Sequence, residues 1–442
     1  MTASPPAGHE PLVAFVTTDY AGITRGRSIA LADYKPGKSL GWVPANMSLT
    51  PFDLIAEPNP WGSAGDLRLL PDDNARYRVR PDGSASDLDM IMSDIVNLDG
   101  SPWVCCPRSF LKQALADLEK EAGLSLLASF EHEFQIFDAG WPGCPAFSLQ
   151  ALRRADPFGS SLMAALRTAG LAPEVFIAEY GKDQYEVAVA PADGLAAADR
   201  AVALREITRE LARNRGWRAS FAPKTAVEGV GNGVHIHFSF RDRKGRPALY
   251  DATQPGCVAK TGGAFVAGIV RHLPALTAFT TGSSISALRL KPHNWSSSYT
   301  WFGDQDREAS LRICPVPRLG KADPAKAFNI EYRPADATAC PHLALGVLVR
   351  AGLEGVRDGL PAPALFSGDP AALSDSERKN LGLTALPGSL GDALDAMLSD
   401  ERVVSWFDPL ALETYAGMKL TELKLAGPAV DDALCARYAE IY

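Results

Sequence analysis

The sequence has no long apolar run, no cluster of basic residues and no CxxC pair. A membrane-spanning helix needs about 18 consecutive apolar residues, and the apolar stretch at 265–270 falls well short of that length. The first ten residues lack the basic region and apolar core of a secretory signal. These absences predict a protein that is neither exported nor membrane-spanning, and therefore a cytoplasmic location.

The charge and the missing motifs exclude several further classes. The 442 residues have a formal net charge of −8, whereas nucleic-acid binders need basic patches. The seven cysteines do not have the spacing of a zinc finger, and the sequence shows no signal peptide. We therefore expect neither disulfides nor a zinc site. No GxxxxGK[ST] loop or complete GxGxxG occurs, so a P-loop or Rossmann nucleotide site is not expected. The expected partners are small molecules, with neither nucleic acid nor membrane among them.

The order of the expected elements is typical of an α+β protein. Short strands and turns fill the first hundred residues, beginning with 12–19 and 26–32, and helical spacing first appears at 109–124. Beyond it, helical segments alternate with strands up to Pro341, where a Leu- and Ala-rich helical tail begins. We therefore expect a small β-rich domain over residues 1–104 and a larger domain over 105–442.

Four predicted strands in the larger domain place polar groups on one face. Side chains two residues apart on a strand point to the same side. The groups are Glu131 with Glu133; Gln184 with Glu186, downstream of Glu179; His235 with His237 and Ser239; and Asn329 with Glu331 and Arg333. Any one of these segments alone is typical of a solvated face. Together, in otherwise apolar strands, they favour a metal site, because carboxylates are costly to bury unless they are paired or metal-bound.

The ligand types and the neighbouring basic residues indicate the chemistry. Carboxylates with one or two imidazoles suit Mg²⁺ or Mn²⁺ better than zinc, and two ions are expected. Arginine offers fixed paired donors for carboxylate and phosphate oxygens. The basic residues are Arg289, Arg307, Arg312, Lys326 and Arg333. Beside a two-metal site they favour phosphoryl transfer, in which catalysis is mainly positioning and charge neutralisation.

These segments, in this order, resemble the glutamine synthetase family from Gly65 to the C-terminus. The motifs are FEHEF, AEYGKDQYE, FAPK followed by GNGVHIH, LPALTAF, RLKPHNW, DREASLR and NIEYRPADATACPHLALGVLVRAGLEGV. The resemblance implies a β-grasp-like N-terminal domain. It also implies a catalytic domain with a curved antiparallel sheet, a half-barrel, flanked by helices.

The resemblance also implies roles for individual residues. The metal that organises the acid substrate would be bound by Glu133, Glu179 and Glu186. The metal on the nucleotide phosphates would be bound by Glu131, His235 and Glu331. ATP would be contacted by His237, Ser239, Arg312 and Lys326. The acid substrate and its surroundings would involve Gly231, Arg289, Arg307, Arg333 and Trp295, with Arg289, Arg307 and Glu331 acting in catalysis.

The family mechanism implies that ATP phosphorylates the γ-carboxylate of L-glutamate. An amine then attacks the acyl phosphate to give an amide, ADP and phosphate. Members stack into double rings with active sites between neighbouring subunits. The resemblance therefore implies a large homo-oligomer, here expected to be a dodecamer.

The departures from the family pattern concern the amine. Trp295 stands where ammonia-using members have a glutamate over the ammonium site, and the N-terminal stretch around Asn46 and Ser48 lacks the usual aspartate. An aromatic wall could pack against the carbon chain of a larger amine or stack on a cationic one. The alternative is that Trp295 is merely structural.

Other departures affect the acid and nucleotide sites. Val230 stands where an asparagine usually contacts glutamate, and Asn329 stands where an arginine usually contacts the nucleotide. The general base for the amine is not identified by the sequence, and Asp53 is one candidate. The leading hypothesis is a γ-glutamyl-amide ligase that uses an organic primary amine in amine catabolism. The alternatives are an ammonia-using glutamine synthetase, a non-catalytic oligomeric homologue and a metal-dependent hydrolase.

Overall fold

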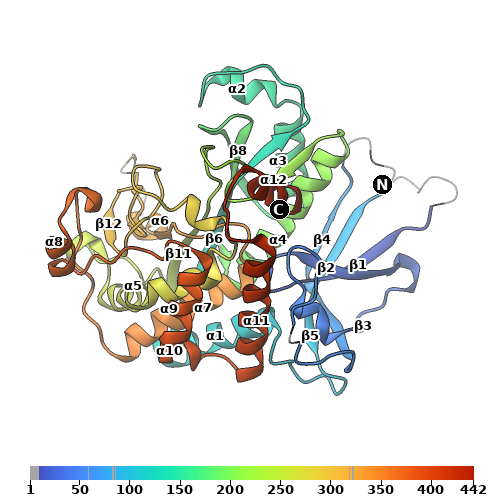
Figure 1. The fold of residues 1–442 in the computed structure, drawn as a ribbon, viewed down its shortest axis with the longest axis horizontal. Helices are drawn as coiled ribbons and strands as arrows, with labels where there is room; N and C mark the ends of the chain where they lie inside the picture. Colours follow the sequence, from blue (N-terminus) through green and yellow to red (C-terminus); the bar gives the residue numbers. More distant parts are fainter. Residues whose placement is uncertain (1–8, 58, 82–83, 85, 318, 321–322) are drawn as a thin grey trace.

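The computed structural model describes residues 9–57, 59–81, 84, 86–317, 319–320 and 323–442. The N-terminal strands form one mixed sheet in the order β2-β1-β5-β4-β3. They are β1 (Leu12–Thr18), β2 (Thr24–Ala30), β3 (Leu40–Trp42), β4 (Leu67–Val79) and β5 (Leu88–Val96). β1 pairs in parallel with β5, and Phe15, Leu69 and Ile91 are fully buried from these strands. The expected small β-rich unit is present, on the right of Figure 1.

The larger part of the chain is built around a second sheet, in the order β12-β13-β14-β11-β6-β8-β7, with β9 and β10 also pairing with β6. Its strands are β6 (Leu124–Phe137), β7 (Pro173–Ala178), β8 (Gln184–Val189), β9 (Ala192–Asp193), β10 (Arg218–Ser220), β11 (Val234–Asp242), β12 (Phe302–Asp304), β13 (Leu311–Ile313) and β14 (Ile330–Tyr332). The sheet is nearly closed and barrel-like, which confirms the predicted half-barrel. β12 pairs with β13 in parallel, whereas β6, β8, β11 and β14 pair antiparallel.

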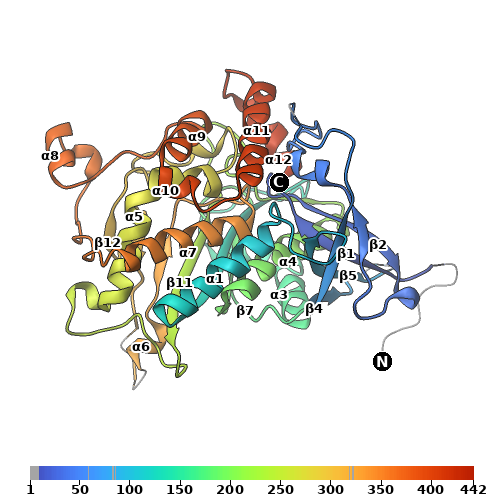
Figure 2. The same ribbon diagram turned by 90° about the horizontal axis from the view of Figure 1, so that it is seen from below.

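Helices cover this sheet and form the C-terminal part. They are α1 (Pro107–Ala122), α2 (Leu149–Arg154), α3 (Phe158–Thr168), α4 (Gly194–Arg213), α5 (Lys260–Thr280), α6 (Pro324–Ala327), α7 (Pro341–Arg357), α8 (Asp375–Asn380), α9 (Leu390–Ser399), α10 (Glu401–Val404), α11 (Pro409–Ala426) and α12 (Asp432–Ile441). Figure 2 shows α1 and α7 side by side in front of the sheet, and α5 packs against α7. The boundary between residues 104 and 105 falls in the turn before α1 and stays a proposal.

Local sequence explains where α1 begins and ends. Pro107 occupies its first turn, where a missing N–H costs nothing, and Gly123 ends it at a left-handed φ of 68°. Helices α5 and α7 approach each other closely through glycine, because a Cβ at Gly268 would come within 2.1 Å of the Ala351 carbonyl oxygen. By length and composition α5 could cross a membrane, but 83% of its most apolar window is buried inside the protein. It is therefore a core helix of the protein.

Candidate functional site

The strand register aligns the polar residues of the sheet. Along a strand the buried face alternates with the polar one, so Phe130, His132 and Phe134 are buried behind Glu131 and Glu133 on β6. Across the strands the opposing pairs are Glu131 with His235, Glu133 with Glu186, His237 with Glu331, and Arg312 with Glu331. The shared polar surface predicted from the sequence is therefore present.

Glu131, His235 and Glu331 form one cluster whose ligand atoms all lie within 4.8 Å of one another. His235 Nδ1 is 3.0 Å from Glu131 Oε1 and 3.4 Å from Glu331 Oε1. Burial and the nearby Arg333 charge lower the pKa of His235 to about 4, so its imidazole is neutral at physiological pH. A neutral imidazole between two carboxylates is a suitable ligand set for a divalent cation.

Glu133, Glu186 and His235 form a second cluster that shares the imidazole with the first. Burial, together with the charges of Glu131, Glu133 and Glu179, raises the pKa of Glu186 to about 10. Burial also raises the pKa of Glu133 to about 7, although its carboxylate accepts a 2.7 Å hydrogen bond from the backbone N–H of Gly233. This half of the site has an excess of carboxylates, which a bound cation would relieve.

Glu179 lies beside the second cluster but is not a member of it. Its Oε2 accepts a 3.2 Å hydrogen bond from the backbone N–H of Tyr180. Burial raises the pKa of Glu179, and the charge of Arg307 opposes that rise. Arg307 is exposed in the turn between β12 and β13. The charge of Glu179 in turn raises the pKa of Glu186, so Glu179 adjoins the second cluster. The side of the site formed by Glu133, Glu179 and Glu186 is called here the acid end.

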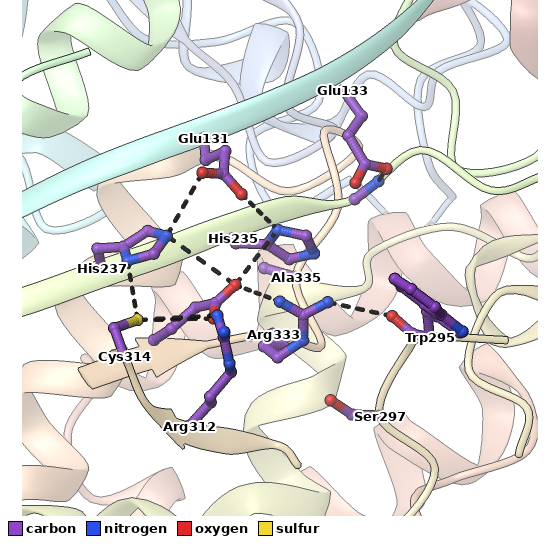
Figure 3. A network of polar contacts seen from close by, with 12 residues as sticks. Glu131, Glu133, His235, His237, Trp295, Ser297, Arg312, Cys314, Arg333 and Ala335 are labelled. Atoms are coloured by element: carbon purple, nitrogen blue, oxygen red, sulfur yellow. Dashed lines mark hydrogen bonds and ion pairs between the residues drawn. The ribbon is translucent and has the colours of Figure 1, made fainter. Parts of the chain in front are cut away.

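Two buried arginines neutralise the first cluster. Arg312 Nη1 donates to Glu331 Oε2 at 2.8 Å, and Arg333 forms an ion pair with the other oxygen of Glu331. Burial raises the pKa of Glu331, but Arg333 and the neighbouring basic groups outweigh that effect and hold the pKa well below its usual range. Figure 3 shows Arg312 and Arg333 converging on this cluster from one side.

Arg289 is buried beneath the acid end of the site. Its Nη2 donates to the Ala335 carbonyl oxygen at 2.8 Å and also to the Pro334 carbonyl oxygen. A Cβ at Gly231 would come within 2.6 Å of Arg289 Cγ, so only glycine fits there without displacing the arginine. The positive charge of Arg289 opposes the effect of burial on the pKa of Glu133, so the guanidinium acts on the second cluster.

The other end of the network surrounds His237. Its Nδ1 lies 2.9 Å from Asn329 Oδ1 and 3.6 Å from Cys314 Sγ. Within the described residues its buried Nε2 has no hydrogen-bond partner, which leaves a polar atom available to a ligand. Ser239 follows two positions along β11, and Lys326 is exposed on α6.

Cys314 was missed by the sequence reasoning. It is buried directly after the end of β13 and two residues after Arg312, so the alternation that identified the other strands would have placed it on the same face. Burial and the charge of Glu331 raise the pKa of its thiol to about 12. Cys314 is therefore a neutral, uncharged neighbour of the His237 end of the site.

Trp295 lies at the opposite end of the network from Cys314 (Figure 3). Its side chain is 67% exposed, its φ is +52°, and its carbonyl oxygen accepts a 3.1 Å hydrogen bond from Arg333 Nη2. Val230 lies in the loop before β11. Asp53, the candidate general base, has a left-handed φ of 59°, and its Oδ1 lies 3.8 Å from Arg25 Nη1.

The donor set fits two divalent cations. The two clusters offer carboxylate oxygens and one shared neutral imidazole, which hard cations accept. Arg312 and Arg333 form ion pairs within the first cluster, whereas Arg289 acts on Glu133 of the second cluster through its charge alone, so the second cluster depends more on a cation for charge balance. Such a pair of ions, next to arginines, suits the stabilisation of phosphate and carboxylate oxygens in one active site.

Comparisons with known proteins agree with this arrangement. Residues 6–103 match the glutamine synthetase N-terminal domain, and residues 104–438 match the glutamine synthetase catalytic domain. The chain is 32% identical to a gamma-glutamylpolyamine synthetase of Streptomyces coelicolor, over 97% of this chain and 93% of the relative. It is also 32% identical to a glutamine synthetase of Pyrococcus furiosus, over 69% of this chain and 68% of that protein.

Solved structures extend the match to the whole chain. A crystal structure of a glutamine synthase homologue aligns with a TM-score of 0.90 and 47% identity, and all of both chains is covered. A GmaS/ADP complex aligns with a TM-score of 0.77 over 93% of both chains at 22% identity, which shows a shared fold. With its two-cluster site, its nearly closed sheet and these matches along its whole length, the chain belongs to the glutamine synthetase family of ATP-dependent ligases.

Proposed function

We propose that this chain joins L-glutamate to an organic primary amine, forming a γ-glutamyl amide through a γ-glutamyl phosphate at the expense of ATP. The observation that supports the organic amine is Trp295, an exposed aromatic residue whose backbone carbonyl oxygen accepts a hydrogen bond from Arg333 of the site. The name of the Streptomyces coelicolor relative, a gamma-glutamylpolyamine synthetase, points to the same class of substrate. A cationic polyamine or another alkylamine would pack its carbon chain, or stack its ammonium group, on this ring.

The proposed reaction has two steps. A γ-carboxylate oxygen of glutamate attacks the γ-phosphorus of ATP, and ADP leaves. The ammonium form of the amine loses a proton, and its free nitrogen then attacks the acyl carbon. Phosphate leaves with the bond electrons, and the nitrogen loses a second proton to give the amide. Bound Mg²⁺ or Mn²⁺ would neutralise the phosphate and carboxylate oxygens during transfer.

The residues would divide this work along the sheet. We assign Glu133, Glu179 and Glu186 to the cation at the acid substrate, and Glu131, His235 and Glu331 to the cation at the nucleotide. Arg289, Arg333 and the Gly231 loop would bind glutamate, and Arg307 would neutralise the transferring phosphoryl group. His237, Ser239, Arg312 and Lys326 would face ATP. We further propose a cytoplasmic double-ring dodecamer that serves amine catabolism.

The experiment is phosphate release from ATP with Mg²⁺ and L-glutamate across ammonia, methylamine, ethanolamine, putrescine, spermidine, isopropylamine and aniline. Mass spectrometry would identify the products. A kcat/KM for an organic amine well above that for ammonia, with the γ-glutamyl adduct, supports the proposal. Preference for ammonia would instead make the chain a divergent glutamine synthetase, and silence across the panel would favour a non-catalytic homologue.

A further inference from the structure

The segment 291–295, called here the Trp295 loop, is exposed and lies between buried residues. Leu290 is buried before it, and Ser296 and Ser297 are buried after it. Ser297 Oγ donates to the Ala309 carbonyl oxygen at 3.3 Å. Both ends of the loop are therefore anchored by buried residues. The conformation of the exposed residues between them depends on the contacts that those residues make.

Glu308 holds that middle part. Its Oε1 accepts a 3.2 Å hydrogen bond from the backbone N–H of Trp295, and its Oε2 accepts another at 3.2 Å from the backbone N–H of His293. Both loop residues have a left-handed φ, +64° for His293 and +52° for Trp295. Side-chain-bearing residues adopt that conformation only when the surroundings stabilise it. One carboxylate supplies this stabilisation at both positions.

Glu308 is itself held rigidly. Its backbone N–H donates to Asp306 Oδ1 at 2.9 Å, and its carbonyl oxygen accepts a 3.0 Å hydrogen bond from Trp301 Nε1. The Trp301 side chain is only 2% exposed. The carboxylate that meets the loop thus projects from a fixed piece of backbone between β12 and β13.

The loop is also joined directly to the site. The Trp295 carbonyl oxygen accepts from Arg333 Nη2, and Arg333 is paired with Glu331 in the first cluster. The His293 ring lies 2.9 Å from Asp369 Oδ2. A shift of the loop would therefore move the Trp295 ring relative to the acid end of the site.

We propose that Glu308 is a positioning residue that fixes the Trp295 loop and thereby selects an organic amine over ammonia. This inference rests on the proposed function. The carboxylate acts through the loop backbone, so its loss releases two N–H groups and lets the ring leave its position. An amine that packs on the ring loses that contact, whereas ammonia has no carbon chain to lose.

The test compares E308A and E308Q with D304N, which removes an exposed acid from the neighbouring strand β12. Hydrogen–deuterium exchange reports the amides of residues 291–297, and steady-state kinetics report kcat/KM for the preferred amine, for ammonia, and the KM values of ATP and glutamate. Glutamine can accept at its carbonyl oxygen only, so it should restore part of the effect.

We expect faster exchange in the loop, in the order E308A, E308Q, wild type. The organic-amine KM should rise about tenfold in E308A, with ammonia kinetics and the KM of ATP and glutamate within about twofold. Unchanged loop exchange, or faster exchange with unchanged amine preference, overturns the positioning role. A wild-type enzyme that accepts only ammonia contradicts the proposed function instead, while the exchange data still report on Glu308.

Discussion

Glu133 on β6 lies directly opposite Glu186 on β8, so two acidic side chains face each other across an antiparallel pair. Like charges in this arrangement destabilise a sheet unless a proton or a cation intervenes. Burial raises the pKa of both, to about 7 for Glu133 and about 10 for Glu186. The pair is thus suited to exchange protons for a divalent cation.

Binding of Mn²⁺ should therefore release protons. With their pKa values raised, these carboxyl groups are substantially protonated near pH 7, and a cation must displace the protons to coordinate the oxygens. Mn²⁺ affinity should rise as the pH rises from 7 towards 10. Isothermal titration calorimetry in two buffers of different ionisation enthalpy measures the release, and identical apparent enthalpies would contradict this prediction.

The variant E186Q should stabilise the metal-free protein and weaken its response to metal, because Glu186 belongs to the second cluster only. A carboxyl group whose folded pKa is raised from 4.5 to about 10 destabilises the fold progressively as the pH rises between these values. Glutamine cannot ionise, so the metal-free Tm of E186Q should fall less than that of the wild type over this pH range, although Glu133 still titrates. E174Q, at an exposed position on β7, is the matched control; a Tm profile of E186Q that follows the control would refute the idea.

The buried Arg108 network should be the main electrostatic contribution to stability. Arg108 is 2% exposed and pairs with Asp72, Asp94 and Asp199 at 2.6, 2.9 and 2.9 Å. Removing one partner leaves buried charges unpaired, so R108M should lower the unfolding free energy by about 3–5 kcal/mol. Denaturant unfolding measures this loss.

A control at an exposed ion pair isolates the effect of burial. Arg246 pairs with Asp242 at 2.7 Å with its side chain 69% exposed, and R246M should change stability by less than about 0.5 kcal/mol. Burial raises the pKa of Asp199, but hydrogen bonds from His342 and Arg108 outweigh it and leave the pKa lowered. The stability from this pairing is present above pH about 4 and is lost as the pH falls further. Equal effects of R108M and R246M on the unfolding free energy would contradict the role given to burial.

The Trp295 ring should decide which amine reacts. W295E places an acid at the exposed position, so kcat/KM for the organic amine should fall about tenfold or more while that for ammonia rises. W295F keeps an aromatic wall and should keep the preference of the wild type. If W295E and W295F behave alike in steady-state kinetics, Trp295 is merely structural.

The sequence predicted the shared polar face of the sheet because alternation along a strand needs only local information. Glu131, Glu133, His235 and Glu331 could be placed on that face without knowing which strands pair. The sequence did not predict the opposing pairs, such as Glu133 with Glu186, because they depend on register between strands about fifty residues apart.

The contacts between loops could not be predicted from the sequence for a different reason. The bonds from Glu308 to His293 and Trp295 join irregular segments, where no periodicity indicates a direction. Arg108 and Asp199 lie 91 residues apart and meet only after two helices pack. Cys314, in contrast, could have been found, because it follows Arg312 at the spacing of a strand.

The most direct test of the central claim is oxygen transfer from glutamate to phosphate. L-glutamate labelled with ¹⁸O in its γ-carboxylate would be incubated with ATP, Mg²⁺ and the preferred organic amine, and the products analysed by mass spectrometry. Formation of an acyl phosphate predicts one labelled oxygen in the released phosphate and one in the γ-glutamyl amide. Unlabelled phosphate, or phosphate release without an amide, would contradict the proposed ligase.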